Sequence, residues 1–198
     1  MTLLDLEPAA RCMTDLVTSV SDEQLDGPTP CSESSVGDLL DHIGGLTLAF
    51  TVAARKAEIE GGSQAPSADA SRLGADWRTR IPNDLAVLVR AWRDPEAWTG
   101  MTEAGGVELP GEVAGLVALN ELVVHGWDVS RACGLAYDGD RSSIEAAHGF
   151  VAQFSGPGQE AAREGLFGPV VPVPANAPLL DQVIGLSGRD PGWTPGDG

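Results

Sequence analysis

Apolar residues recur at steps of three and four along five stretches of the chain, which is the period of an amphipathic α-helix. Capping residues and helix breakers set their limits: Ser34-Ser35 precedes the second stretch, Pro110-Gly111 opens the fourth, and Gly134 ends it. Pro82 falls inside the third stretch and predicts a kink or a break there. The predicted helices cover roughly residues 6–20, 36–50, 71–92, 111–132 and 142–153.

The segments outside these helices are rich in glycine, serine and proline. The stretch 60–67 predicts a surface loop, and 103–107 predicts a turn with short extended flanks. After the fifth helix, a Pro- and Gly-rich tail over 156–198 contains one more short helix at 177–186. The sequence shows no repeat and no alternation of strands and helices. It therefore predicts one all-α domain over the whole chain, a helix bundle over about 1–155 followed by this tail.

The composition is that of an ordinary globular protein, with 42% hydrophobic and 21% charged residues. Apolar runs are short, so we expect no membrane-spanning segment, and Met1–Val20 lacks the apolar core of a secretory signal. The three cysteines Cys12, Cys31 and Cys133 are odd in number and widely spaced, which is typical of free thiols in a reducing compartment. A cytoplasmic location follows as an expectation.

The charge balance excludes one class of partner. Twelve basic residues stand against 29 acidic ones, giving a net charge of −17. Such a chain repels phosphate, so we expect it to bind neither nucleic acid nor an anionic membrane. Otherwise the charge favours solubility and specifies no function.

The fourth predicted helix carries the residues best suited to metal binding or catalysis. Glu121 and His125 are four residues apart, so they lie on one face of the helix with Cβ atoms about 5–6 Å apart. A carboxylate and an imidazole placed in this way suit a divalent first-row metal ion, and otherwise form a surface pair. Asp128 is expected either to accept a hydrogen bond from the free ring nitrogen of His125 or to pair with Arg131.

A metal site needs further ligands, and the chain has only three histidines in which to find one. His42 lies at the edge of the buried stripe of the second helix, whereas His148 is interpreted as structural or exposed. Together with Glu121 and His125, His42 gives three protein ligands and leaves coordination positions open, as in catalytic zinc sites. The alternative is a hydrogen-bonded, partly buried histidine. Cys31 is interpreted as an inert thiol, since no basic neighbour is visible in the sequence.

Six segments carry a resemblance to a known family. The chain resembles actinobacterial metal-binding proteins related to the N-terminal domain of mycothiol-dependent maleylpyruvate isomerase, in the DinB-like superfamily. The resemblance implies a DinB-like four-helix bundle, to which this chain adds a fifth helix and the tail, and a metal, usually zinc, on His42, Glu121 and His125. The similar segments are Pro28-Thr-Pro-Cys31, Val36-Gly-Asp-Leu-Leu-Asp-His42, Ala91-Trp-Arg-Asp-Pro95, Pro110-Gly-Glu-Val113, Glu121-Leu-Val-Val-His-Gly-Trp-Asp128 and Leu186-Ser-Gly-Arg-Asp-Pro-Gly-Trp193.

Three functions are compatible with such a site. The first is a zinc-dependent S-transferase or isomerase that activates a low-molecular-weight thiol, mycothiol, against an electrophile. The second is a non-catalytic metal-binding or interaction module, favoured because nothing obviously basic or nucleophilic flanks the ligands in sequence. The third is a metal-dependent hydrolase. About 45 residues follow the fifth helix, so by ordinary domain sizes we expect no separate C-terminal domain like that of the isomerase. DinB-like proteins are often dimers, so a homodimer is a further expectation.

Overall fold

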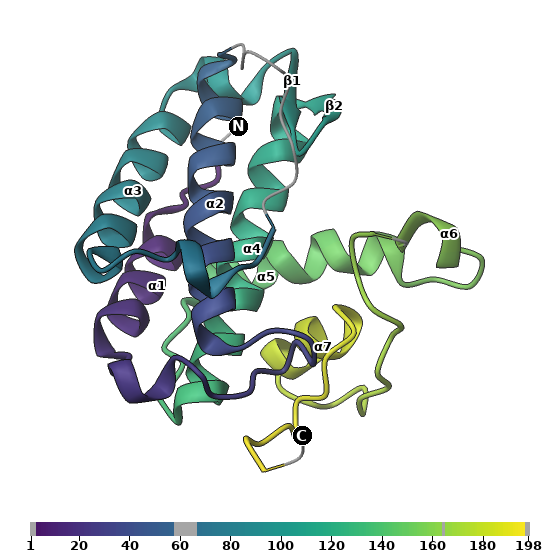
Figure 1. Ribbon diagram of the computed structural model, residues 1–198. Coiled ribbons are helices and arrows are strands. Elements are labelled where there is room, and N and C mark those ends of the chain that lie inside the picture. The colour runs from purple at the N-terminus through teal and green to yellow at the C-terminus, as the bar shows by residue number, and fades with distance from the viewer. Residues whose placement is uncertain (1–2, 58–66, 164, 197–198) are drawn as a thin grey trace.

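The computed structural model describes residues 3–57, 67–163 and 165–196, so the loop predicted at 60–67 lies almost entirely outside the described residues. Within them the chain is mostly helical, with one short antiparallel hairpin (Figure 1). The α-helices are α1 (Glu7–Ser19), α2 (Val36–Arg55), α3 (Trp77–Trp92), α4 (Gly111–Cys133), α5 (Arg141–Val151), α6 (Glu160–Arg163) and α7 (Leu179–Leu186). The hairpin strands are β1 (Met101–Ala104) and β2 (Val107–Pro110).

The helices α1 to α4 form a four-helix bundle, because each buries the apolar stripe that the sequence predicts. The helix α2 packs against α3 and α4, and α1 packs against the same two helices from the other side. Figure 1 shows these four helices side by side, with α5 leading away from them. The predicted all-α bundle with a fifth helix and a C-terminal tail is confirmed. Its most deeply buried side chains include Met13, Val17, Val36, Leu40, Ile43, Ile81, Leu85, Leu88 and Leu119.

A capping box fixes the start of α2. The Ser35 hydroxyl accepts a hydrogen bond from the Asp38 amide at 3.2 Å, and the Asp38 carboxylate accepts one from the Ser35 amide at 2.9 Å. The same carboxylate accepts a hydrogen bond from the Ala70 amide at 2.7 Å. The register of α2, and with it the face on which His42 lies, is therefore anchored at both its own N-terminus and the segment before α3.

The helix α4 is the centre of the molecule and is buried along most of its length. It contacts α1, α2 and α5, so few of its positions face solvent. It ends at Gly134, whose φ of 65° is the left-handed conformation expected at a helix C-terminus. Near its start Gly115 lies against two tryptophans, and an added Cβ would come within 2.5 Å of the Trp98 ring. Several polar side chains of α4, among them Asn120, His125 and Asp128, thus lie inside the protein.

Several predicted boundaries differ from the structure. The third helix begins at Trp77 and not near residue 71, because Gly74 takes a φ of 72° and ends the short turn before it. It then continues through Pro82 as one helix, so no break occurs there. Asp140, and not a serine, caps α5: its carboxylate accepts a hydrogen bond from the Ser143 amide at 3.0 Å.

The helix α2 is long and apolar enough to cross a membrane when only length and composition are considered. This segment was not identified from the sequence, where only uninterrupted apolar runs were considered. More than half of its most apolar stretch is buried inside the protein, and the core helix of a bundle passes the same test. The apolar character of α2 is explained by its place between α3 and α4.

The tail is a folded unit that packs on α5 through α7 (Figure 1). Val183 and Ile184 of α7 are fully buried. Buried Arg163 donates hydrogen bonds to the carbonyls of Gly168 and of Leu186, which ties α6 to the end of α7. These contacts position the residues that follow α7 against α4.

Candidate metal centre

The structure brings His42 of α2 together with Glu121 and His125 of α4. One ligand atom from each residue lies within 4.8 Å of the other two. The two imidazole rings meet edge to face, with centroids 5.1 Å apart and planes at 89°. His148 lies on α5 and belongs to no such cluster among the described residues. The one-turn spacing on α4 and the packing of α2 against α4 together produce this convergence.

Both ring nitrogens of His125 have carboxylate partners. Nε2 lies 2.9 Å from Glu121 Oε2, and Nδ1 lies 3.0 Å from Asp128 Oδ2. Of the two partners considered for Asp128, the structure therefore shows His125. Arg131 instead donates a hydrogen bond to the Pro191 carbonyl at 2.8 Å. The Asp128 side chain is completely buried, so its orientation is fixed by these contacts and not by solvent.

A second charged partner of Asp128, Arg189, comes from the tail. It was not identified from the sequence. Arg189 Nε lies 3.0 Å from Oδ1 of Asp128, and Nη2 lies 3.0 Å from Oδ2, which is the two-pronged geometry of a strong ion pair. The Arg189 side chain is 15% exposed. Its motif contributed to the family resemblance, but no spacing rule connects positions 61 residues apart. Only the packing of α7 reveals this contact.

Cys31 lies beside this ion pair. Its Sγ is 3.4 Å from Arg189 Nη2 and 3.6 Å from Asp128 Oδ2. Arg189 is a basic neighbour that was not visible in the sequence, yet the thiol is not activated. Burial, with the Asp128 charge, raises the pKa of Cys31 to about 11, and the nearby guanidinium only partly opposes this. All three cysteines are free thiols, as predicted.

The carboxylates on either side of His125 determine its charge. Burial disfavours the imidazolium, but hydrogen bonds to Asp128 and Glu121 outweigh burial and raise the pKa of His125 to about 9. Burial likewise opposes ionisation of Glu121 and Asp128, yet His125 lowers the pKa of the first, and Arg189 with His125 lowers that of the second. Without a metal ion, the site at neutral pH thus holds a charged imidazolium between two carboxylates.

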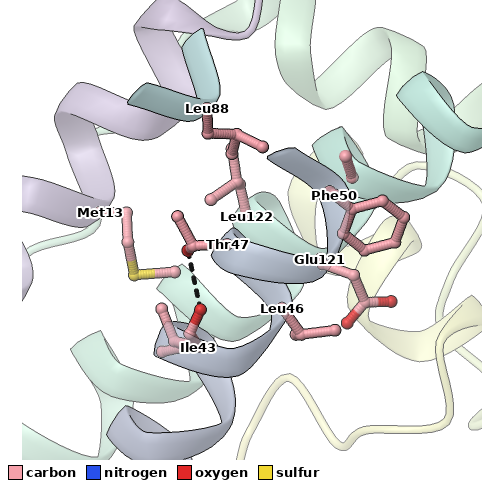
Figure 2. A pocket seen from close by; sticks show the side chains of 9 residues that line it. Met13, Ile43, Leu46, Thr47, Phe50, Leu88, Glu121 and Leu122 are labelled. Carbon is pink, nitrogen blue, oxygen red and sulfur yellow. Dashed lines mark hydrogen bonds between the residues drawn. The ribbon is translucent and has the colours of Figure 1, made fainter. Parts of the chain in front are cut away.

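The two sides of Glu121 differ in character. On the side of the bundle core lies a cavity of about 10 Å³, room for one water at most, and its Thr47 hydroxyl already donates to the Ile43 carbonyl at 2.7 Å. Figure 2 shows the Glu121 carboxylate pointing away from Met13, on the side where Leu46 lies. The core side therefore offers no space for a ligand.

On the other side of Glu121 lies a cavity of about 460 Å³, within the size range of small-molecule sites. His42, Glu121, His125 and Arg189 are all part of its wall. Its remaining wall comes from α2, the hairpin, α4, α5 and the tail. The clustered ligand atoms thus border a space large enough for a small molecule.

Comparison with known proteins places this arrangement in a family. The family described as mycothiol maleylpyruvate isomerase N-terminal domain matches residues 6–130, the segment that includes α1 to α3 and the candidate metal ligands on α2 and α4. The chain belongs to this family. The recognised resemblance is thereby confirmed, while Arg189 lies beyond the matched segment.

The chain is also similar to individual proteins, one by its sequence and two solved structures by their fold. An uncharacterized protein of Mycobacterium tuberculosis, found in two strains, is 30% identical over 180 residues, which cover 88% of this chain and 90% of that protein. The crystal structure of a mycothiol-dependent maleylpyruvate isomerase superposes with a TM-score of 0.58 at 16% identity, over 78% of this chain and 74% of that one. A histidine-to-alanine mutant of the isomerase gives 0.57 at 15% identity. These two structures establish the shared fold.

Proposed function

We propose that this protein holds one divalent metal ion, zinc by its donor set, on His42, Glu121 and His125. The observation that carries the proposal is the convergence of their ligand atoms within 4.8 Å, from two separate helices, at the wall of a cavity. Ligand atoms around a tetrahedral zinc ion are roughly 3.3 Å apart, so the three donors fit such an ion after small side-chain adjustments. Two imidazoles and one carboxylate form a ligand set typical of catalytic zinc with an open position.

The surroundings of His125 support the same proposal. A histidine that ligates a metal through one nitrogen usually donates its other N–H to a carboxylate, which fixes the ring orientation. Asp128 is in that position at 3.0 Å from Nδ1, and Arg189 holds the Asp128 carboxylate in turn. Nε2 is left directed at the Glu121 carboxylate, where a shared ion would lie.

For the reaction, we propose that a low-molecular-weight thiol attacks an electrophile, in an S-transfer or a thiol-assisted isomerisation. A divalent ion in the site would lower the pKa of a bound thiol and make it a nucleophile at neutral pH. The protein's own nearby thiol does not serve this purpose, because the pKa of Cys31 is raised to about 11 and its Sγ faces Asp128 and Arg189. This supports the proposal that the nucleophile is a small-molecule thiol. The solved relatives, named as mycothiol-dependent isomerases, make mycothiol the first thiol to test.

The test begins with metal content. Purified protein should bind one Zn²⁺ or Co²⁺ per chain, measured by elemental analysis and by Co²⁺ absorption. The variants His42→Ala and His125→Ala should lose it, whereas His148→Ala, a histidine outside the cluster, should keep it. Equal metal binding by all three variants would refute the site.

The second part of the test concerns the thiol. Addition of mycothiol to the Co²⁺ protein should produce a sulfur-to-cobalt charge-transfer band, and the zinc protein should consume mycothiol in the presence of an electrophile. A bound metal without a change in the Co²⁺ spectrum would refute the thiol reaction. Ester or amide hydrolysis by the zinc protein without any thiol would instead establish a hydrolase, and metal binding alone would leave a non-catalytic module.

A further inference from the structure

The cavity beside the candidate metal centre is apolar except at one end. Aliphatic side chains of α2, the hairpin and α4 cover one part of its wall. Three phenylalanines cover another: the Phe150 and Phe154 rings are 5.2 Å apart, and those of Phe154 and Phe167 are 5.8 Å apart. Such a wall favours an apolar ligand body, because burying that body removes apolar surface from water on both sides.

The cavity offers little to a ligand that carries several negative charges. Its two cationic side chains in the metal-free protein are already paired: Arg189 lies 3.0 Å from Asp128, and the His125 imidazolium lies between the carboxylates of Glu121 and Asp128 at 2.9 and 3.0 Å. Glu121, which also lines the cavity, is itself a carboxylate. A dicarboxylate would therefore lose its hydration without gaining a matching number of positive partners. The wall selects against that class of substrate.

One buried polar group in the wall lacks a partner. Asn120 is 2% exposed and lines the cavity, and its Oδ1 accepts no hydrogen bond. Buried polar atoms in native proteins are almost always paired, so an unpaired amide oxygen on a residue that lines a cavity points to a ligand that supplies the missing donor. Asn120 precedes Glu121 on α4, and both residues line the cavity.

We infer that the cavity takes a small uncharged molecule with an apolar body of about six to ten carbon atoms and one hydrogen-bond donor. The body lies against the phenylalanines and the donor pairs with Oδ1 of Asn120. Val107 and Leu166, which are 62% and 57% exposed, form the apolar rim through which it enters. Its role in the reaction rests on the proposed function: there the molecule is the electrophile that the thiol attacks.

The first experiment measures this preference in protein stripped of metal, so its outcome does not depend on the metal proposal. The uncharged fluorophore N-phenyl-1-naphthylamine serves as the probe, and 1-butanol, 1-hexanol and 1-octanol compete with it. Competition should strengthen about fourfold for each added methylene, because each is buried against the wall. Maleate, a dicarboxylate, should not compete. Competition that is independent of chain length, or maleate acting as strongly as 1-hexanol, would overturn the inference.

Two variants locate the binding within the cavity. Val107→Asp places a charge on the rim and should weaken 1-octanol binding at least tenfold. Met101→Asp is the matched control, since Met101 lies on the same hairpin, is 51% exposed and is not part of the wall. This control should bind as the wild type does. Equal binding by both variants would place the alcohol elsewhere and refute the inference.

The role of Asn120 is tested with a ligand that lacks the donor. Wild-type protein should bind 1-octanol several-fold more tightly than its methyl ether. The variant Asn120→Leu has a side chain of similar size and should remain folded, because it removes a buried Oδ1 that has no hydrogen-bond partner. It should bind the two compounds equally well. Unchanged discrimination in this variant would show that Asn120 does not contact the ligand.

Discussion

The ion pair between Arg189 and Asp128 makes the tail part of the site, and its removal has a predictable cost. We consider Arg189→Met, which keeps the apolar stem and removes the guanidinium. Asp128 is completely buried, and it would lose three contacts of 3.0 to 3.1 Å. Among the residues that the structure describes, His125 and the weakly polar Cys31 thiol would remain as hydrogen-bond partners of its carboxylate. The variant thus leaves the buried Asp128 carboxylate with one of its two charged partners, His125.

Breaking a buried ion pair by removing one partner costs about 3–5 kcal/mol. Because the His125 imidazolium still faces Asp128 at 3.0 Å, we expect a loss near the lower limit, about 3 kcal/mol. For a protein of this size that lowers the melting temperature by roughly 6–12 °C. Arg189 lowers the pKa of Asp128, so this stabilisation is present above the unfolded pKa of about 3.9 and is lost as the pH falls further.

Urea denaturation at pH 7, followed by circular dichroism, measures the effect. The double variant Asp128→Asn, Arg189→Met should recover much of the lost stability, because it no longer buries an unpaired charge. Arg131→Met is the control, because Arg131 donates to a backbone carbonyl at 2.8 Å and not to Asp128; it should cost no more than about 1 kcal/mol. A loss below 1 kcal/mol in Arg189→Met, or a double variant as unstable as the single one, would refute this reasoning.

Three further predictions follow from other parts of the structure. Because the pKa of His125 is raised from 6.5 to about 9, zinc binding at pH 7 should release about one proton, and zinc affinity should rise about tenfold per pH unit up to pH 9. Calorimetry in buffers of different ionisation enthalpy measures both quantities. A zinc affinity that does not depend on pH would contradict the prediction. Gly115→Ala should lower the free energy of unfolding by about 1–3 kcal/mol in urea denaturation, because its Cβ would clash with Trp98. Gly149→Ala, whose Cβ would have no atom within 4 Å, should raise it by about 0.5–1 kcal/mol. Equal effects of the two variants would show that the space around each glycine does not determine the change in stability. Since the pKa of Cys31 is about 11, iodoacetamide should alkylate it at pH 7.5 at least about a hundredfold more slowly than an unperturbed thiol. Mass spectrometry measures the alkylation rate, with Cys31→Ser as the control. Rapid labelling of Cys31 would disprove the raised pKa.

Local patterns in the sequence determined the helices and half of the candidate site. The period of apolar residues located the five main helices, because burial of one face is the strongest constraint on an amphipathic segment. The four-residue spacing of Glu121 and His125 placed both on one face of α4 for the same local reason. His42 followed from the small number of histidines and from the family resemblance. Boundaries such as that at Asp140 were missed, because several neighbouring polar residues can cap a helix equally well.

The tertiary structure alone decided which distant residues complete the site. Arg189 lies 61 residues from Asp128, and Cys31 lies 97 residues from it, so no helical or strand period connects either pair. Their contacts depend on α7 packing against α5 and on the loop before α2, which are matters of shape and burial in three dimensions. The unpaired amide of Asn120 likewise becomes meaningful only once the surrounding helices have removed it from water.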